Sequence, residues 1–125
     1  MPLTRDFRET VKARAARDPA FRAGLYQESM QALLDGDFGT AKILLRDFIN
    51  ATVGFAQLGR RIDVPEKSLM RMFGPNGNPR AENLMAVVAA LKEECRLSLT
   101  VHAMPARRRI ARAPEHEAAW RRSLV

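Results

Sequence analysis

The stretch "LGRRIDVPEKSLMRMF", from Leu58 to Phe73, places a proline and several polar residues between two short apolar segments. Leu58 and Ile62 are four residues apart in the first segment, and Leu69 and Met72 are three apart in the second. These spacings predict two short helices joined by a tight turn. Such a pair occurs both as plain packing core and as a helix-turn-helix that binds DNA, so its function depends on the surrounding sequence.

The residues between the two segments fit the requirements of a helix-turn-helix. That motif needs a small residue where its helices cross, a residue that tolerates a left-handed backbone in the turn, and an apolar residue after it. Gly59, Asp63 and Val64 occupy these positions. Glycine is the usual occupant of the turn position, but aspartate is among the few residues that adopt this conformation at modest cost. Order and spacing therefore favour a helix-turn-helix.

Length and composition indicate one mostly helical unit. The chain has 125 residues, of which 46% are apolar and only 6% are aromatic. Apolar residues that are mainly Ala, Leu, Val and Met favour helices over a β-sandwich. No apolar run approaches the roughly 18 residues of a membrane span, and the first residues lack the apolar core of a signal peptide. We therefore expect a cytoplasmic protein with no membrane partner.

Positive charge is concentrated in two parts of the chain. The net charge is +7. Residues 54–73 carry four basic side chains against two acidic ones, and residues 103–125 carry six arginines against two glutamates. A basic excess suits a partner made of phosphates.

Residues with catalytic or metal-binding chemistry are few. The single cysteine, Cys95, cannot form an internal disulfide, and its helical spacing from the preceding apolar residues predicts a buried structural position. His102 and His116 have no second ligand at metal-binding spacing, and no nucleophile elbow or zinc signature is present. The loop "GPNGNP" at 74–79 lacks the lysine and serine of a nucleotide-binding loop. The sequence therefore predicts no enzyme, no cofactor and no metal site.

Capping residues, prolines and glycines divide the chain into helices. These signals predict six helices, the last of which ends near Glu94. Their predicted starts are Thr4, Asp18 with Pro19, Asp37 or Thr40, Phe55, Pro65, and Asn78 with Pro79. We therefore expect an N-terminal helical extension at 1–36, a DNA-binding domain at 37–102 and a basic tail at 103–125.

After the last helix the apolar period changes from helical to alternating. In "LSLTVH" the apolar residues Leu97, Leu99 and Val101 alternate with polar ones, as in a half-buried strand. No other segment is confidently a strand, and a lone strand needs a partner. The same strand of a second subunit is favoured over an edge strand of another protein. We therefore expect a homodimer in which these three residues form the contact.

The stretch from Leu58 to Phe73 resembles the helix-turn-helix of the Xre/Cro-like regulators, which include the lambdoid phage repressors. The longer run at 32–102 is similar to the HigA-like addiction-module antidote proteins: both have a "GD" before the helix that leads to the motif, an "SL" in the second helix, a "GNP" loop and a final strand, here "LSLTV". The resemblance implies a lambda-repressor-like core in an all-α bundle of five or six helices with a short C-terminal strand. The N-terminal helices and the arginine-rich tail are additions to a minimal antidote protein.

The resemblance also implies which residues contact DNA. Arg71 or Lys67 would donate to guanine O6 and N7, Glu66 would accept from a cytosine amino group, and Met70 would touch a thymine methyl. The implied base-contacting residues are Glu66, Lys67, Ser68, Met70 and Arg71. The implied phosphate contacts are the amide groups near Phe55 and Gln57, together with Arg60, Arg61, Asn76, Asn78 and Arg80.

Together these features predict a sequence-specific regulator of double-stranded DNA. The family resemblance implies an antitoxin that represses its own operon and neutralises a RelE-like toxin. The alternative is a helical interaction module that binds a toxin-like partner without recognising DNA. The tail segment "ARRRIAR" suits either an arm lying along DNA or a solubilising extension, and the sequence does not decide between them.

Overall fold

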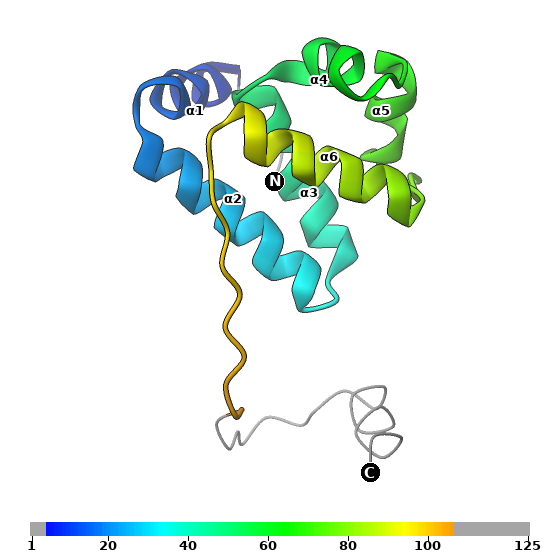
Figure 1. The fold of residues 1–125 in the computed structure, drawn as a ribbon. Helices are drawn as coiled ribbons and strands as arrows, with labels where there is room; N and C mark the ends of the chain where they lie inside the picture. The colour runs from blue at the N-terminus through cyan, green and yellow to red at the C-terminus, as the bar shows by residue number, and fades with distance from the viewer. Residues whose placement is uncertain (1–4, 107–125) are drawn as a thin grey trace.

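The computed structural model describes residues 5–106 as six helices followed by an extended segment (Figure 1). The helices are α1 (Arg5–Arg17), α2 (Pro19–Leu34), α3 (Phe38–Ala51), α4 (Gly54–Ile62), α5 (Glu66–Met72) and α6 (Ala81–Glu94). The prediction of a mostly helical fold is confirmed. The predicted cap at Thr4, and the arginine cluster of the tail, lie outside the described residues.

Aspartate caps begin two of the helices. The Asp18 carboxylate accepts hydrogen bonds from the backbone amides of Ala20 and Phe21 at 3.1 and 3.2 Å, as its position before Pro19 predicts. The Asp37 carboxylate accepts from the amide of Thr40 at 3.2 Å, so Asp37 and not Thr40 is the cap of α3. Hydrogen bonding to Thr40 lowers the pKa of Asp37, because it stabilises the charged carboxylate.

The sixth helix begins later than its sequence signals predict. Asn78 was the expected cap, but α6 starts at Ala81 with Arg80 as an extended N-cap residue that makes no side-chain cap. The chain is still leaving α5 at Gly77, where a Cβ atom would come within 2.1 Å of the Met72 carbonyl oxygen. Residues 78–80 are therefore needed to carry the chain from the end of α5 to α6.

One apolar core joins the N-terminal helices to the rest of the molecule. The ring of Tyr26 on α2 packs against Phe48 of α3 with 5.6 Å between ring centroids. Its hydroxyl donates a hydrogen bond to the Val88 carbonyl of α6 at 3.0 Å. Tyr26 lies in the same cluster of buried side chains as Leu58 and Leu69. The region predicted as an N-terminal extension therefore supplies part of the core on which α4 and α5 rest.

The segment after α6 is extended, but it forms no strand within residues 5–106. The backbone amide of Leu97 bonds to the Lys92 carbonyl at 2.8 Å and closes the helix end, where Arg96 has a φ of 54°. Beyond this point the chain runs along α2 (Figure 1). A strand needs a hydrogen-bonded neighbour, which no other part of residues 5–106 provides. The expected strand pairing therefore stays a prediction about a second chain.

None of the helices in the described part of the chain has the length and apolar character that crossing a membrane requires.

The predicted burial of Cys95 at the end of α6 is confirmed, since its side chain is 7% exposed. Burial raises the pKa of its thiol above the ordinary value of 9.0, with a smaller opposing contribution from a hydrogen bond to Thr52.

The raised pKa of Cys95 predicts a loss of stability in alkali. Above about pH 9 the thiol ionises in the unfolded chain while it stays protonated in the folded one, so unfolding becomes more favourable as the pH rises. We expect the free energy of unfolding of the native protein to fall more steeply than that of Cys95→Ala between about pH 8 and pH 10. Urea unfolding of both proteins across this range checks the prediction, and parallel curves would contradict it.

Candidate nucleic-acid interface

The turn between α4 and α5 is built around Asp63. This residue follows the last residue of α4 with φ 57° and ψ 48°, so the left-handed backbone predicted for it is confirmed. The backbone amide of Val64 then donates to the Gly59 carbonyl at 3.0 Å and closes the turn. Val64 is half-buried and packs against the core. The turn thereby places α5 directly against α4.

Gly59 of α4 lies close against the turn and the start of α5. A Cβ atom at this position would be 2.6 Å from the Val64 carbonyl oxygen and 3.6 Å from Cδ1 of Leu69. Backbone cannot move aside as a flexible side chain can, so only glycine fits without distortion. Leu58 and Leu69, on either side of the crossing, are fully buried. The small residue and the apolar inner faces thus lie where the sequence pattern predicted them.

The left-handed residue offers a stability test of the turn. We expect Asp63→Gly to raise the free energy of unfolding by a few tenths to about 1 kcal/mol, because glycine adopts positive φ without a Cβ penalty. Asp63→Val should lower it by more than 1 kcal/mol, since β-branched residues fit this region worst. Thermal or urea unfolding of both variants and the native protein measures the order of their stabilities. Equal stabilities would show that the turn relaxes to another conformation.

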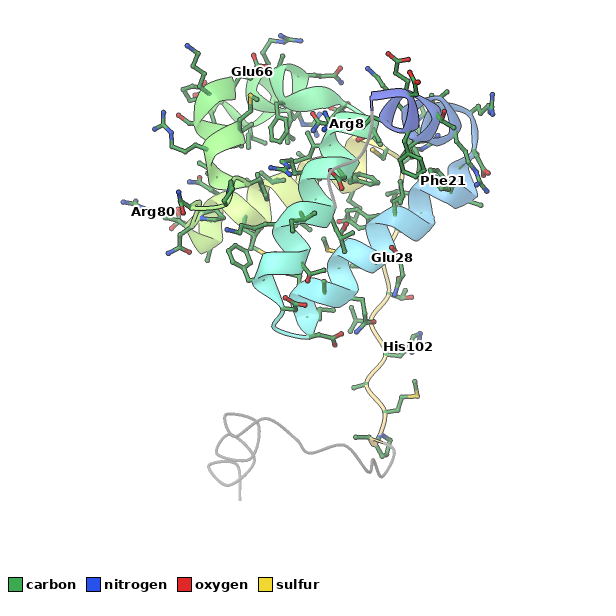
Figure 2. All side chains as sticks on the ribbon, turned by 180° about the vertical axis from the view of Figure 1, so that it is seen from behind. Arg8, Phe21, Glu28, Glu66, Arg80 and His102 are labelled. Carbon is green, nitrogen blue, oxygen red and sulfur yellow. The ribbon has the colours of Figure 1, made fainter. Side chains whose placement is uncertain are left out.

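The two faces of α5 differ in exposure. Leu69 is fully buried and Met72 half-buried, whereas four of the five predicted base-contacting residues are exposed: Glu66, Lys67, Met70 and Arg71. The fifth, Ser68, is half-buried. Glu66 lies at the outer edge of the molecule (Figure 2). The outer face of α5 therefore combines two cationic groups, one carboxylate and one thioether, all accessible to a partner.

Lys67 and Arg71 are one helical turn apart on this outer face. Neither of them makes an ion pair with any residue of the described range 5–106. Two like charges at positions i and i+4 repel each other by a few tenths of a kcal/mol in an exposed helix. An anionic partner placed between them would offset that repulsion, so this pair favours an anion at the outer face of α5.

The predicted phosphate contacts of α4 fall into two groups. The guanidinium of Arg61 forms an ion pair with Glu93 and lies 3.1 Å from a carboxylate oxygen of Glu94, both at the end of α6. The side-chain amide of Gln57 donates to Glu94 at 3.4 Å. These two side chains therefore face the acidic end of α6 in the structure. Arg60 is exposed and lines a shallow groove beside the turn.

The beginning of α4 contributes backbone amides. The ring of Phe55 is buried against Phe73, with 6.4 Å between centroids, so only its backbone amide could contact a phosphate, as predicted. Val53 is the N-cap residue and supplies no side-chain hydrogen bond. The amides of the first turn thus lack a side-chain cap, which leaves donors that an anion could satisfy.

The loop between α5 and α6 presents the remaining predicted contacts. Asn76, Asn78 and Arg80 are all exposed. Arg80 and Glu66 lie on the part of the molecule formed by α4, α5 and this loop, far from His102 on the C-terminal segment (Figure 2). The loop and the outer face of α5 could therefore contact one extended partner together.

The predicted dimerisation residues lie on the extended segment. Leu97 and Leu99 are half-buried against the core, and Val101 is 67% exposed. Leu99 and Val101 border a groove that also includes Gln27 and Leu34 of α2. The predicted alternation of burial thus holds for the first two residues and ends before Val101.

Two interactions near the interface have no signal in the sequence. Lys42 of α3 donates from Nζ to the carbonyl oxygens of Gly74, Pro75 and Gly77, at 3.2, 3.4 and 2.9 Å. The pairing of Arg61 with the end of α6 is equally distant in sequence. Neither pair follows a local spacing rule, so sequence periodicity could not have identified them.

The described part of the chain contains no group of three or more His, Cys, Asp or Glu side chains placed to hold a metal ion. Comparison of the chain with protein-family models, with curated proteins and with solved structures finds no match.

Proposed function

We propose that this protein is a sequence-specific DNA-binding regulator that uses α4, the Asp63 turn and α5 as a helix-turn-helix. The observation that carries the proposal is the outer face of α5. Lys67 and Arg71 stand exposed and without ion-pair partners in the described part of the chain, directly opposite the buried Leu69. A basic, polar outer face on a helix fixed by a tight turn suits the major groove.

Each exposed group on α5 has a complementary group on a base edge. Arg71 or Lys67 would donate to guanine O6 and N7, and Glu66 would accept from a cytosine amino group. Met70, which is 51% exposed, would contact a thymine methyl. Ser68 lies beside them, and because its side chain is half-buried it would contact a base less extensively than they do. These contacts would supply sequence preference.

Affinity would come from the surrounding cationic and amide groups. Arg60, Asn76, Asn78 and Arg80 are exposed around α5 and would contact phosphates. Gln57 and Arg61 would do so only after leaving Glu93 and Glu94, so we assign them a lesser part. The amides near Phe55 would add the anion-binding end of α4.

We further propose that the protein binds DNA as a homodimer, in a lambda-repressor-like arrangement. Leu97, Leu99 and Val101 would pair with the same segment of a second copy as a short strand, which would satisfy the backbone groups of the extended segment. Two α5 helices would then enter successive major grooves about one helical turn, or roughly 34 Å, apart. We also propose that the protein is an antitoxin, which represses its own operon and neutralises a RelE-like toxin.

Selection from random double-stranded DNA tests the proposal. We expect enrichment of a palindromic site whose half-sites are about 10 base pairs apart, centre to centre. Enrichment of a single half-site would support the helix-turn-helix and contradict the dimer. Failure to enrich any sequence over repeated rounds would contradict sequence-specific binding.

A second candidate is a protein-interaction module that binds a toxin-like partner without recognising DNA. The groove between α2 and the extended segment favours it, because Leu99, Val101 and Leu34 place partly exposed apolar surface beside a backbone that forms no strand pairing within residues 5–106. An edge strand of another protein could pair there. Capture of a small basic protein, with no shift of DNA at low salt, would favour this candidate.

A further inference from the structure

Lys42 connects α3 to the loop that follows α5. Its side chain is half-buried, and its ammonium group donates to three carbonyl oxygens of one loop, those of Gly74, Pro75 and Gly77. An ammonium group has three donors, so the three contacts match its full hydrogen-bonding capacity. The aromatic ring of Phe38, one helical turn earlier, has its centroid 5.5 Å from Nζ. The lysine is thus confined on several sides and directed at the loop.

The loop that Lys42 contacts has a tight backbone. The amide of Gly74 donates to the Arg71 carbonyl at 3.1 Å, and the amide of Gly77 donates to the Gly74 carbonyl at 3.0 Å. Gly77 also lies so close to the end of α5 that a Cβ atom would be 2.3 Å from the Arg71 carbonyl oxygen. Several carbonyl dipoles therefore converge at the C-terminal end of α5, where a positive charge is favourable.

The same contacts matter for α5 because it has few other attachments. It is seven residues long, and its only extensive packing against another helix of the described chain is with α4. Its beginning is fixed by the turn at Asp63, and the loop after its end is fixed by Lys42. The two exposed asparagines of the loop each follow a residue whose carbonyl Lys42 contacts: Asn76 follows Pro75, and Asn78 follows Gly77.

We propose that Lys42 is a positioning residue for DNA binding: through three loop carbonyls it holds the loop, and with it Asn76, in the geometry that phosphate contact requires. This inference rests on the proposed function and deepens it. Lys42 does not itself contact phosphate, because its ammonium group is occupied by the loop. Its contribution to affinity should therefore be insensitive to salt, unlike that of a lysine that displaces counterions.

The first test follows the loop without DNA. In Lys42→Met the amides of Gly74 and Gly77, which donate to the Arg71 and Gly74 carbonyls, should exchange faster with solvent, whereas amides of α2 and α3 keep their protection. Lys42→Arg, which retains charged donors, should restore slow exchange. Lys12→Met removes an exposed lysine of α1 and controls for the loss of one charge. Unchanged exchange in Lys42→Met would overturn the inference.

The second test uses DNA affinity and its salt dependence. Lys42→Met should weaken binding about fivefold, the effect of one net hydrogen bond, with the slope of log affinity against log salt unchanged. Arg80→Ala serves as a reference that lowers this slope by about 1. In an Asn76→Ala background, Lys42→Met should have an effect below about twofold, because the positioned contact is already gone.

The outcomes separate the two proposals. Coupling between Lys42 and Asn76 at constant salt slope supports the positioning role. Additive effects, or a slope lowered by about 1 in Lys42→Met, overturn it by making Lys42 an independent group or a direct phosphate contact. If the native protein selects no DNA sequence, the proposed function fails and the positioning role with it. Loop exchange would still report whether Lys42 orders the loop.

Discussion

Arg71→Ala is expected to weaken binding to the preferred DNA site by about 1–3 kcal/mol, roughly 5- to 150-fold, and to relax base preference at one position of each half-site. The physical reason is the loss of a guanidinium that can donate two hydrogen bonds to one guanine. Arg71 is exposed on α5 and makes no ion pair within residues 5–106, so removing it leaves no buried group unsatisfied. Stability should therefore stay within about 0.5 kcal/mol of the native protein.

A charge-matched control separates base recognition from general attraction. Lys12→Ala removes one exposed positive charge from α1 and should lower affinity for all sequences slightly and equally. Titration of the preferred site, and of sites with each base changed, gives the preference for both variants. If Arg71→Ala binds preferred and random DNA as the native protein does, α5 is not the element that contacts the bases.

Gly59→Ala is expected to lower the free energy of unfolding by about 1–3 kcal/mol, although alanine is intrinsically the better helix former. The added Cβ would lie 2.6 Å from the Val64 carbonyl oxygen, so α4 and the turn must separate to admit it. The separation would also shift α5, which rests on this contact through Leu69. DNA affinity should therefore fall by more than the change in folded population explains.

Gly24→Ala is the matched control for this substitution. Gly24 lies within α2, and a Cβ atom there meets nothing within 4 Å. The same change should raise the free energy of unfolding by about 0.5–1 kcal/mol through helix propensity alone. If the backbone around Gly59 leaves no room for a side chain, urea unfolding of the two variants gives changes in the free energy of unfolding of opposite sign. Stabilisation by both would show that the crossing accommodates a side chain.

Local signals predicted much of the helical structure. The Asp18 cap, the end of α1 at Arg17 and the left-handed turn at Asp63 each depend on a residue's own backbone preference or on neighbours within one turn. The predicted start of α6 was wrong. Asn78 and Pro79 resemble a helix cap in sequence, but in the structure they belong to the connection between α5 and α6. Local signals fail where a distant backbone fixes the chain direction.

The surroundings of the candidate interface depended on contacts that no spacing rule encodes. Lys42 meets a loop more than 30 residues later, and Arg61 meets Glu93 and Glu94 at a similar separation. Arg61 was predicted to contact phosphate, and no partner was predicted for Lys42. The pattern of exposed residues on α5 could be predicted because a short helix with Leu69 buried leaves only one outer face.

Fluorescence anisotropy of the full chain on DNA from upstream of its own gene and on scrambled DNA, across a salt series, tests sequence-specific recognition most directly. We predict tighter binding to the upstream DNA that persists at physiological salt, since base contacts do not release counterions. Equal binding to both DNAs that collapses steeply as salt rises would contradict it, because the protein would then be responding to phosphate charge alone.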